Sequence, residues 1–186
     1  MRKNTGCGTN RSPAPGVPKS CASAWNAAMR SRCCPMTPNG TSWFCWNSSG
    51  SERWSFRGGP WLLEIVAGII DHPGETTEDV ARRETTEEAG CELLDLIPIC
   101  HYLVSPGGTS ESITLFCGRV DASTVTPGVR GVACEHEDIR VHVVSRAEAL
   151  DLLHSGRINS AAPIIALQWL ELNRTKLLAR WEITPA

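Results

Sequence analysis

Val17 is the only valine, leucine or isoleucine among the first 58 residues of this 186-residue chain. One such side chain cannot build the core of a strand or helix, so we expect residues 1–58 to be disordered. No apolar run of seven residues follows the basic start of the chain, so we expect no secretory signal there. No stretch approaches the roughly 20 apolar residues of a membrane span, and we expect no membrane partner.

The nine cysteines are an odd number without a secretory context, which argues against a disulfide framework. Cys33, Cys34 and Cys45 lie close together in the sequence, but no paired C-x-x-C spacing supports a zinc site. We therefore expect a cytoplasmic protein.

The charge is distributed unevenly, although the formal net charge of −2 gives no indication of nucleic acid as a partner. Residues 1–58 carry eight Lys/Arg and one acidic residue, whereas residues 59–186 carry ten Lys/Arg and nineteen acidic residues. Composition thus divides the chain into a segment at 1–58 and a domain at 59–186.

The domain shows clear helical and strand patterns. A helix is indicated at 75–90, because Thr76 or Thr77 can cap its start and Gly90 suits the position after its end. Ser145 and Glu148 form a capping-box pattern at the start of a second helix. The mixture predicts an α/β sandwich. We expect strands at 61–66, 92–104, 112–120 and 138–144, a turn at 105–111, and helices at 75–90, 145–156 and from about 161 to 181.

Three glutamates share one face of the first helix. At about 100° per residue, Glu84, Glu87 and Glu88 fall within an arc of about 100°. Like charges four residues apart repel each other, so such a face is either a solvated acidic surface or a site for a divalent cation such as Mg²⁺. The spacing alone favours neither.

The segment from Gly68 to Cys91, GIIDHPGETTEDVARRETTEEAGC, resembles the Nudix box, G-x5-E-x7-R-E-U-x-E-E-x-G-U, where U is a bulky aliphatic residue. The first loop is one residue longer than in the motif, and Thr85 and Cys91 stand at aliphatic positions. The loop can absorb an insertion ahead of the helix, but the Thr85 hydroxyl must find a hydrogen-bond partner.

Other stretches narrow this resemblance to the bacterial ADP-ribose pyrophosphatases. LLEIVAG precedes the box, and SPGGTSE, CEHEDIRVHVV and INSAAPIIALQWL follow it, so that residues 60–182 are covered. The resemblance implies a Nudix α/β/α sandwich with a mixed β-sheet. It also implies Mg²⁺-dependent hydrolysis of ADP-ribose to AMP and ribose 5-phosphate by a homodimer, with Mn²⁺ as a substitute metal.

The same resemblance assigns metal ligands and a catalytic base. The ligands would be the main-chain carbonyl of Ala67 and the side chains of Glu84, Glu88 and Glu137, with Glu87 assisting through water. Glu135 would be the base, because a carboxylate outside the first metal shell keeps its basicity. From the residues alone, 135 and 137 are typical of an exposed acidic loop, and His136 between them is a rival base near neutral pH.

Further positions follow from the resemblance. Ile69, Ser105, Gly107 and Glu111 would contact the substrate, since glycine lets the backbone approach a phosphate or ribose closely. Four residues would have structural roles in the box. They are Gly68, Gly90 and the ion-paired Glu75 and Arg83.

Residues 1–58 contain nothing similar to the N-terminal region of that family, which pairs subunits and begins the sheet. An unrelated disordered tail is one explanation. Translation in the wrong frame up to about residue 58 is another, in which each new codon takes the last base of one codon and the first two of the next. Seven residues are then fixed whatever the codon choice: Glu from Trp25–Asn26, Leu from Cys33–Cys34, Asp from Met36–Thr37, Val from Trp43–Phe44, Leu from Phe44–Cys45, Leu from Cys45–Trp46 and Glu from Trp46–Asn47.

With permitted codons elsewhere, residues 25–50 become ERGHAVAVLPYDPERDELVLLEQFR, which resembles the missing strand, turn and strand followed by a substrate-binding arginine. On this hypothesis the N-terminal part is not native, and the chain lacks two strands, the dimer arm and that arginine. It would then bind ADP-ribose poorly. Rival functions are hydrolysis of another nucleoside diphosphate sugar or NADH, and a non-catalytic Nudix module.

Overall fold

The computed structural model describes residues 29–36, 42–48, 61–125, 128–130 and 139–183. Within these ranges no helix is long and apolar enough to cross a membrane. The strands are β1 (Met29–Met36), β2 (Ser42–Ser48), β3 (Trp61–Glu64), β4 (Val66–Ile69), β5 (Asp95–Leu103), β6 (Ser112–Arg119), β7 (Gly128–Arg130) and β8 (Ile139–Val144). The helices are α1 (Thr77–Glu84), the π-helical turn η2 (Thr85–Ala89), the 3₁₀ turn η3 (Ala122–Thr124), α2 (Arg146–His154) and α3 (Ala161–Arg180).

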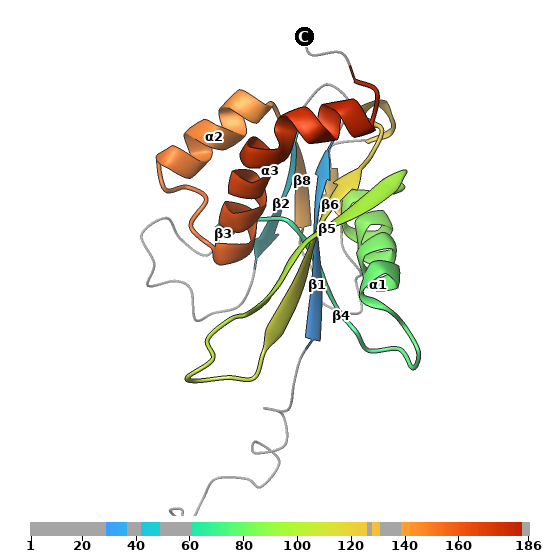
Figure 1. Cartoon of the computed structure of the whole chain (residues 1–186), viewed down its shortest axis with the longest axis vertical. Helices are drawn as coiled ribbons and strands as arrows, with labels where there is room; N and C mark the ends of the chain where they lie inside the picture. The colour runs from blue at the N-terminus through green and yellow to red at the C-terminus, as the bar shows by residue number, and fades with distance from the viewer. Residues whose placement is uncertain (1–28, 37–41, 49–60, 126–127, 131–138, 184–186) are drawn as a thin grey trace, which may run out of the picture.

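The eight strands form one mixed sheet with the order β5-β6-β1-β2-β8-β7, while β3 pairs with β2 and β4 pairs with β1 (Figure 1). β1 runs parallel to β6, and the other pairs are antiparallel. The single strand expected at 61–66 is divided at Ile65, because β3 pairs with β2 whereas β4 pairs with β1.

Helices cover both faces of the sheet, and each face has its own core. Along β6, Leu115 and Cys117 pack into the core under α2 and α3, whereas Phe116 packs into the core under α1 and η2. This alternation is the period of two that a strand buried on both faces requires. The predicted α/β/α sandwich is therefore confirmed, with α1 on one side of the sheet and α2 and α3 on the other in Figure 1.

The helix boundaries follow the expected capping chemistry. The Thr76 hydroxyl accepts a hydrogen bond from the Asp79 amide, and the Asp79 carboxylate accepts one from the Thr76 amide in return. Ser145 caps α2 by accepting from the Glu148 amide. Gly90 ends the first helical segment in the left-handed region, with φ 65°, which glycine adopts without the steric penalty of a side chain.

The structure corrects the single α-helix expected at 75–90. α1 ends at Glu84, and the chain continues as a π-helical turn through Ala89. The buried Thr85 hydroxyl donates to the Ala81 carbonyl at 2.6 Å, which supplies the partner that the sequence required. Threonine back-bonding of this kind perturbs a helix, and π-helical turns occur frequently at functional sites.

Within the segment 1–58, which composition predicts to be disordered, the structure describes the strands β1 and β2 at 29–36 and 42–48. β1 and β2 lie in the middle of the sheet, and β1 pairs with β6 along all eight of its residues. Main-chain hydrogen bonds explain this result. Nearly every residue type carries the same backbone donor and acceptor, and the neighbouring strands present theirs.

Candidate active site

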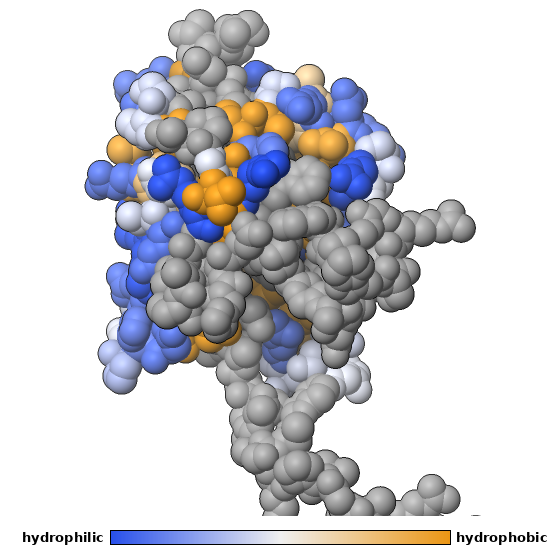
Figure 2. All heavy atoms as spheres, turned by 180° about the vertical axis from the view of Figure 1, so that it is seen from behind, coloured by the Kyte–Doolittle hydropathy of each residue, from blue (hydrophilic) through white to orange (hydrophobic). Residues whose placement is uncertain are grey.

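Two buried carboxylates lie where the first helical segment packs against β4. Glu84, the last residue of α1, is 9% exposed, and Glu88, in η2, is 3% exposed. Glu87, the third member of the predicted acidic face, is exposed. Two of the three glutamates are thus buried toward the sheet, and one lies at the rim. Hydrophilic side chains dominate the left edge of Figure 2, which corresponds to the α1 side of Figure 1.

The backbone of β4 fixes both buried carboxylates. The Ala67 amide donates a hydrogen bond to Glu88 Oε2 at 3.1 Å. At Gly68, a β-carbon would stand 2.2 Å from Glu84 Oε1, so the carboxylate fills the space that glycine leaves open. Gly68 is therefore required by close packing, and the main chain at 67–68 forms a cradle for two acidic side chains.

Arg83 connects the acidic groups around this cradle. The predicted ion pair with Glu75 is present, with Arg83 Nε 3.0 Å from Glu75 Oε1. This hydrogen bond, reinforced by the nearby Glu84 charge, raises the pKa of the guanidinium above its ordinary value. The remaining acceptors of the guanidinium are Glu75 Oε2 at 3.4 Å, Glu84 Oε1 at 2.9 Å, Glu87 Oε2 at 3.2 Å, the Ile69 carbonyl at 3.4 Å and Asp71 Oδ1 at 3.5 Å.

The donor set has the chemistry that a hard divalent cation selects, namely carboxylate oxygens. Within the described residues, no group of three or more His, Cys, Asp or Glu side chains could hold a metal ion. Glu84 and Glu88 thus form a buried pair that fits part of a site. Glu135 and Glu137 lie outside the described residues, and so does His136.

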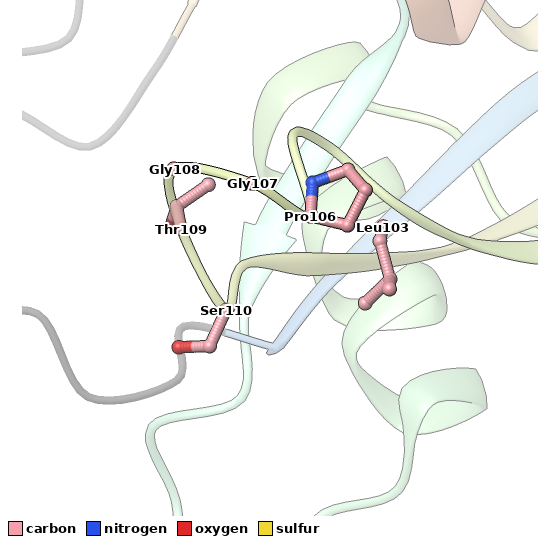
Figure 3. A pocket seen from close by; sticks show the side chains of 6 residues that line it. All are labelled: Leu103, Pro106, Gly107, Gly108, Thr109 and Ser110. Carbon is pink, nitrogen blue, oxygen red and sulfur yellow. The ribbon is translucent and has the colours of Figure 1, made fainter. Parts of the chain in front are cut away.

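The loop that joins β5 to β6 lines an open hollow of about 450 Å³ (Figure 3). Its lining consists of Leu103 and residues 106–110. The Ser105 carbonyl accepts hydrogen bonds from the amides of Gly108 and Thr109, both at 2.9 Å, and these bonds set the shape of the turn. Figure 1 shows this loop and the loop before α1 on opposite sides of the lower end of the sheet. The loop at 105–111 and the loop before α1 thus lie apart in this view.

Ile69, the other predicted substrate contact, ends β4 and is 43% exposed beside the carboxylate cradle. Two residues near the site carry no sequence signal. Asp71 lies in the lengthened loop of the box and reaches Arg83. Arg130, from β7, packs against Gly90. Neither has a position in the Nudix motif, so only the fold brings them to the helix.

The sandwich and its carboxylate-bearing helix define a class of domain. The family model described as the NUDIX domain matches residues 32–173, and the chain belongs to this family.

Among curated proteins, the chain is similar to the ADP-ribose pyrophosphatase of Escherichia coli strain K12, with 52% identity over 122 residues, which cover 66% of this chain and 57% of that protein. The ADP-ribose pyrophosphatase of Haemophilus influenzae is 46% identical over 123 residues, covering 66% of this chain and 56% of that one. GDP-mannose pyrophosphatase of Escherichia coli strain UTI89 is 30% identical over 112 residues, covering 60% and 56%. The matched region thus spans little more than half the length of these relatives.

A solved structure titled "Crystal structure of ADP compounds hydrolase" superimposes with a TM-score of 0.60 at 21% identity. It covers 78% of this chain and 74% of the other. This likeness concerns the fold.

Proposed function

We propose that this Nudix domain hydrolyses ADP-ribose to AMP and ribose 5-phosphate in a Mg²⁺-dependent reaction. The observation that carries the proposal is the pair of buried carboxylates, Glu84 and Glu88, held against the β4 backbone at Ala67 and Gly68. Burying two acidic groups is unfavourable unless positive charge and hydrogen bonds compensate them, and a divalent cation would add to the compensation that Arg83 gives Glu84 and the Ala67 amide gives Glu88. The 52% identity to a protein named ADP-ribose pyrophosphatase supports the choice of substrate.

Mg²⁺, or Mn²⁺ in its place, would be held by Glu84, Glu88, Glu137 and the Ala67 carbonyl, with Glu87 assisting. When bound, the metal would neutralise charge on the diphosphate and lower the pKa of a bound water. The chain's own residues orient these ligands. The Ala67 amide holds one oxygen of Glu88, and Arg83 holds Glu84 and Glu87 by hydrogen bonds.

Glu135 would accept the proton of the attacking water. A base outside the metal shell retains its affinity for protons, and a positioned base contributes about 10²–10⁴ in rate. Substrate would be contacted at Ile69, Ser105, Gly107 and Glu111. The glycine at 107 has open space where a side chain would stand, which allows close approach of a ligand.

The proposal includes the reading frame. We infer that residues 1 to about 58 are translated out of frame, with the frame restored near 57–61. Four of the seven residues that the genetic code fixes in the other frame fall within β2, and they read Val, Leu, Leu and Glu. A strand in the middle of a covered sheet favours such aliphatic residues. The chain as it stands would therefore bind ADP-ribose weakly, and the family dimer arm would be absent.

Two other functions remain as candidates. The likeness to a GDP-mannose pyrophosphatase favours another nucleoside diphosphate sugar as substrate, and NADH belongs to the same chemical class. A non-catalytic Nudix module is disfavoured, because a binding protein has no need of a base at Glu135. We place the protein in the cytoplasm, without nucleic acid or membrane partners.

The test compares the full chain with the same chain carrying the restored frame. Each is incubated with ADP-ribose, GDP-mannose or NADH in the presence of Mg²⁺, Mn²⁺ or EDTA, and the products are separated by chromatography. We expect AMP and ribose 5-phosphate in equal amounts from ADP-ribose, none with EDTA, and a much faster reaction in the restored protein. A restored protein without metal-dependent products would refute the function. Equal rates in both proteins would refute the frame inference.

A further inference from the structure

The guanidinium of Arg130 lies directly on Gly90, where the helical segment that bears the carboxylates ends. A β-carbon on Gly90 would stand 2.3 Å from Arg130 Cζ and 2.3 Å from Nη1. Real β-carbons are not found at such separations from other atoms, so any side chain at 90 would displace the guanidinium. The glycine is thus required twice, once for its φ of 65° and once for this contact.

The contact places a positive charge at the end of a helical segment. The last carbonyls of a helix lack intrahelical donors and carry partial negative charge, which cations stabilise. Arg130 also acts electrostatically on the thiol of Cys91, the next residue. Burial raises the pKa of that thiol to about 11, and the guanidinium opposes the shift. The charge therefore lies close to the chain at positions 90 and 91.

Arg130 is held in place by strand pairing. It ends β7, where it is paired with Ile139, the first residue of β8. Both strands contact η2. Ile139 is fully buried in the core that contains Ala89 of η2. The arginine therefore extends from a fixed strand onto the end of the turn that carries Glu88.

We propose that Arg130 is a positioning residue that holds η2 against β7 and β8 and so keeps Glu88 on the Ala67 amide. The consequence for metal binding and turnover rests on the proposed function, but the clamp itself does not. Glu88 lies two residues before Gly90, within the same short turn. Movement of this turn would shift its carboxylate relative to the backbone cradle.

A double-mutant cycle on the full chain tests the clamp. Gly90→Ala is measured by urea unfolding in the wild-type protein and in an Arg130→Ala background. We expect Gly90→Ala to raise the unfolding equilibrium constant by a factor at least about threefold smaller in the Arg130→Ala background, because the clash is gone while the backbone strain remains. Arg140→Ala, an exposed arginine on β8, is the matched control background and should leave the Gly90→Ala effect unchanged. Equal Gly90→Ala effects in all three backgrounds would overturn the clamp.

Metal binding and kinetics test the positioning role. Mn²⁺ binding is followed by electron paramagnetic resonance in the wild type and in the Arg130→Ala, Arg130→Lys and Arg140→Ala variants. We expect Arg130→Ala to weaken Mn²⁺ binding about tenfold and to lower kcat with little change in KM. Arg130→Lys retains the positive charge without the planar guanidinium, and its Mn²⁺ affinity and kcat should fall between those of the wild type and Arg130→Ala. Unchanged Mn²⁺ binding in Arg130→Ala would refute the positioning role. Failure of the proposed function would give a different result, namely a wild-type protein that binds Mn²⁺ but hydrolyses no substrate.

Discussion

Glu84 Oε1 lies 2.2 Å from the point where a β-carbon on Gly68 would stand. Gly68 lies in β4 and Glu84 ends α1. Because Gly68 has no side chain, the Glu84 carboxylate can occupy the space beside the β4 backbone. The spacing of the glycine and the glutamate within the motif thus has a physical cause in this chain, because the strand and the helix approach until the carboxylate touches the main chain.

Gly68→Ala is expected to reduce kcat/KM by about 10²-fold, because displacement of Glu84 by about 1 Å would misplace a proposed metal ligand. The measurement is steady-state hydrolysis of ADP-ribose across a range of Mg²⁺ concentrations. Gly128→Ala is the control, since nothing lies within 4 Å of its added β-carbon. A Gly68→Ala protein with wild-type kinetics would show that Glu84 can move without consequence.

Arg83→Met is expected to destabilise the fold by about 2 kcal/mol, because it leaves the Glu75 and Glu84 carboxylates without their charged donor. The Glu75 side chain is 10% exposed and that of Arg83 is 26% exposed, so solvent replaces the lost contacts poorly. Urea unfolding measures the change. Arg83→Lys should restore part of it, and Lys176→Met, on an exposed position of α3, should have little effect. A loss equal to that of Lys176→Met would contradict the structural role.

Much of the architecture can be predicted from periodicity and capping. Thr76, Ser145 and Gly90 mark helix boundaries because their side chains, or the lack of one, act on the neighbouring backbone. The π-helical turn at 85–89 could not be predicted by the same reasoning. It arises where the Thr85 hydroxyl bonds to a carbonyl inside a buried interface, and the sequence indicated only that the hydroxyl needed a partner.

Composition gave no indication of β1 and β2, because a strand can be held by its main chain when partners flank it on both sides. The site was predictable as a set of residue types. The site's geometry was not predictable from spacing, because Glu87 is exposed while Glu84 and Glu88 are buried, and a long-range contact brings Arg130 to Gly90. Such contacts depend on which strands become neighbours.

We expect the free energy of unfolding at acidic pH to depend on the interaction of Asp95 with Arg180 and Trp181 at the end of α3. Arg180 Nε lies 3.0 Å from its carboxylate, and Trp181 Nε1 donates to the same oxygen at 2.8 Å. The hydrogen bond from Arg180 is the main cause that lowers the Asp95 pKa to about 2. A lowered pKa stabilises the folded state above the ordinary aspartate value, and this contribution is lost as the pH falls toward 2.

Asp95→Asn should therefore cost about 1 kcal/mol near pH 6, since solvent screens the exposed Arg180, and almost nothing at pH 2. The quantity measured is the difference in unfolding free energy between wild type and variant from pH 6 to pH 2. Asp151→Asn, at an exposed position on α2, is the control. A difference that stays constant over this range would show that Asp95 gains no stability from its charge.

Glu135→Gln is expected to slow turnover by about 10²–10⁴-fold while Mn²⁺ binding stays unchanged, because the amide cannot accept a proton and the residue is not a proposed ligand. Kinetics and Mn²⁺ titration are measured on the same preparation. His136→Asn should keep near wild-type turnover. Full activity in Glu135→Gln, together with loss in His136→Asn, would transfer the base to the histidine.

The genomic DNA over codons 20–62 is expected to contain one inserted or missing base near codons 57–61, since all seven residues fixed by the code in the other frame match the family segment. Independent sequencing from the source provides the measurement.

Restoring the frame should raise the urea midpoint, because β1 and β2 would then carry apolar side chains in the middle of the sheet, where aliphatic residues stabilise both cores. If the DNA confirms every base, the codons themselves separate a lesion carried by the gene from an unrelated tail. An unchanged midpoint in the restored protein would contradict the frame inference, because side chains read in the wrong frame would then pack as well as the aliphatic ones.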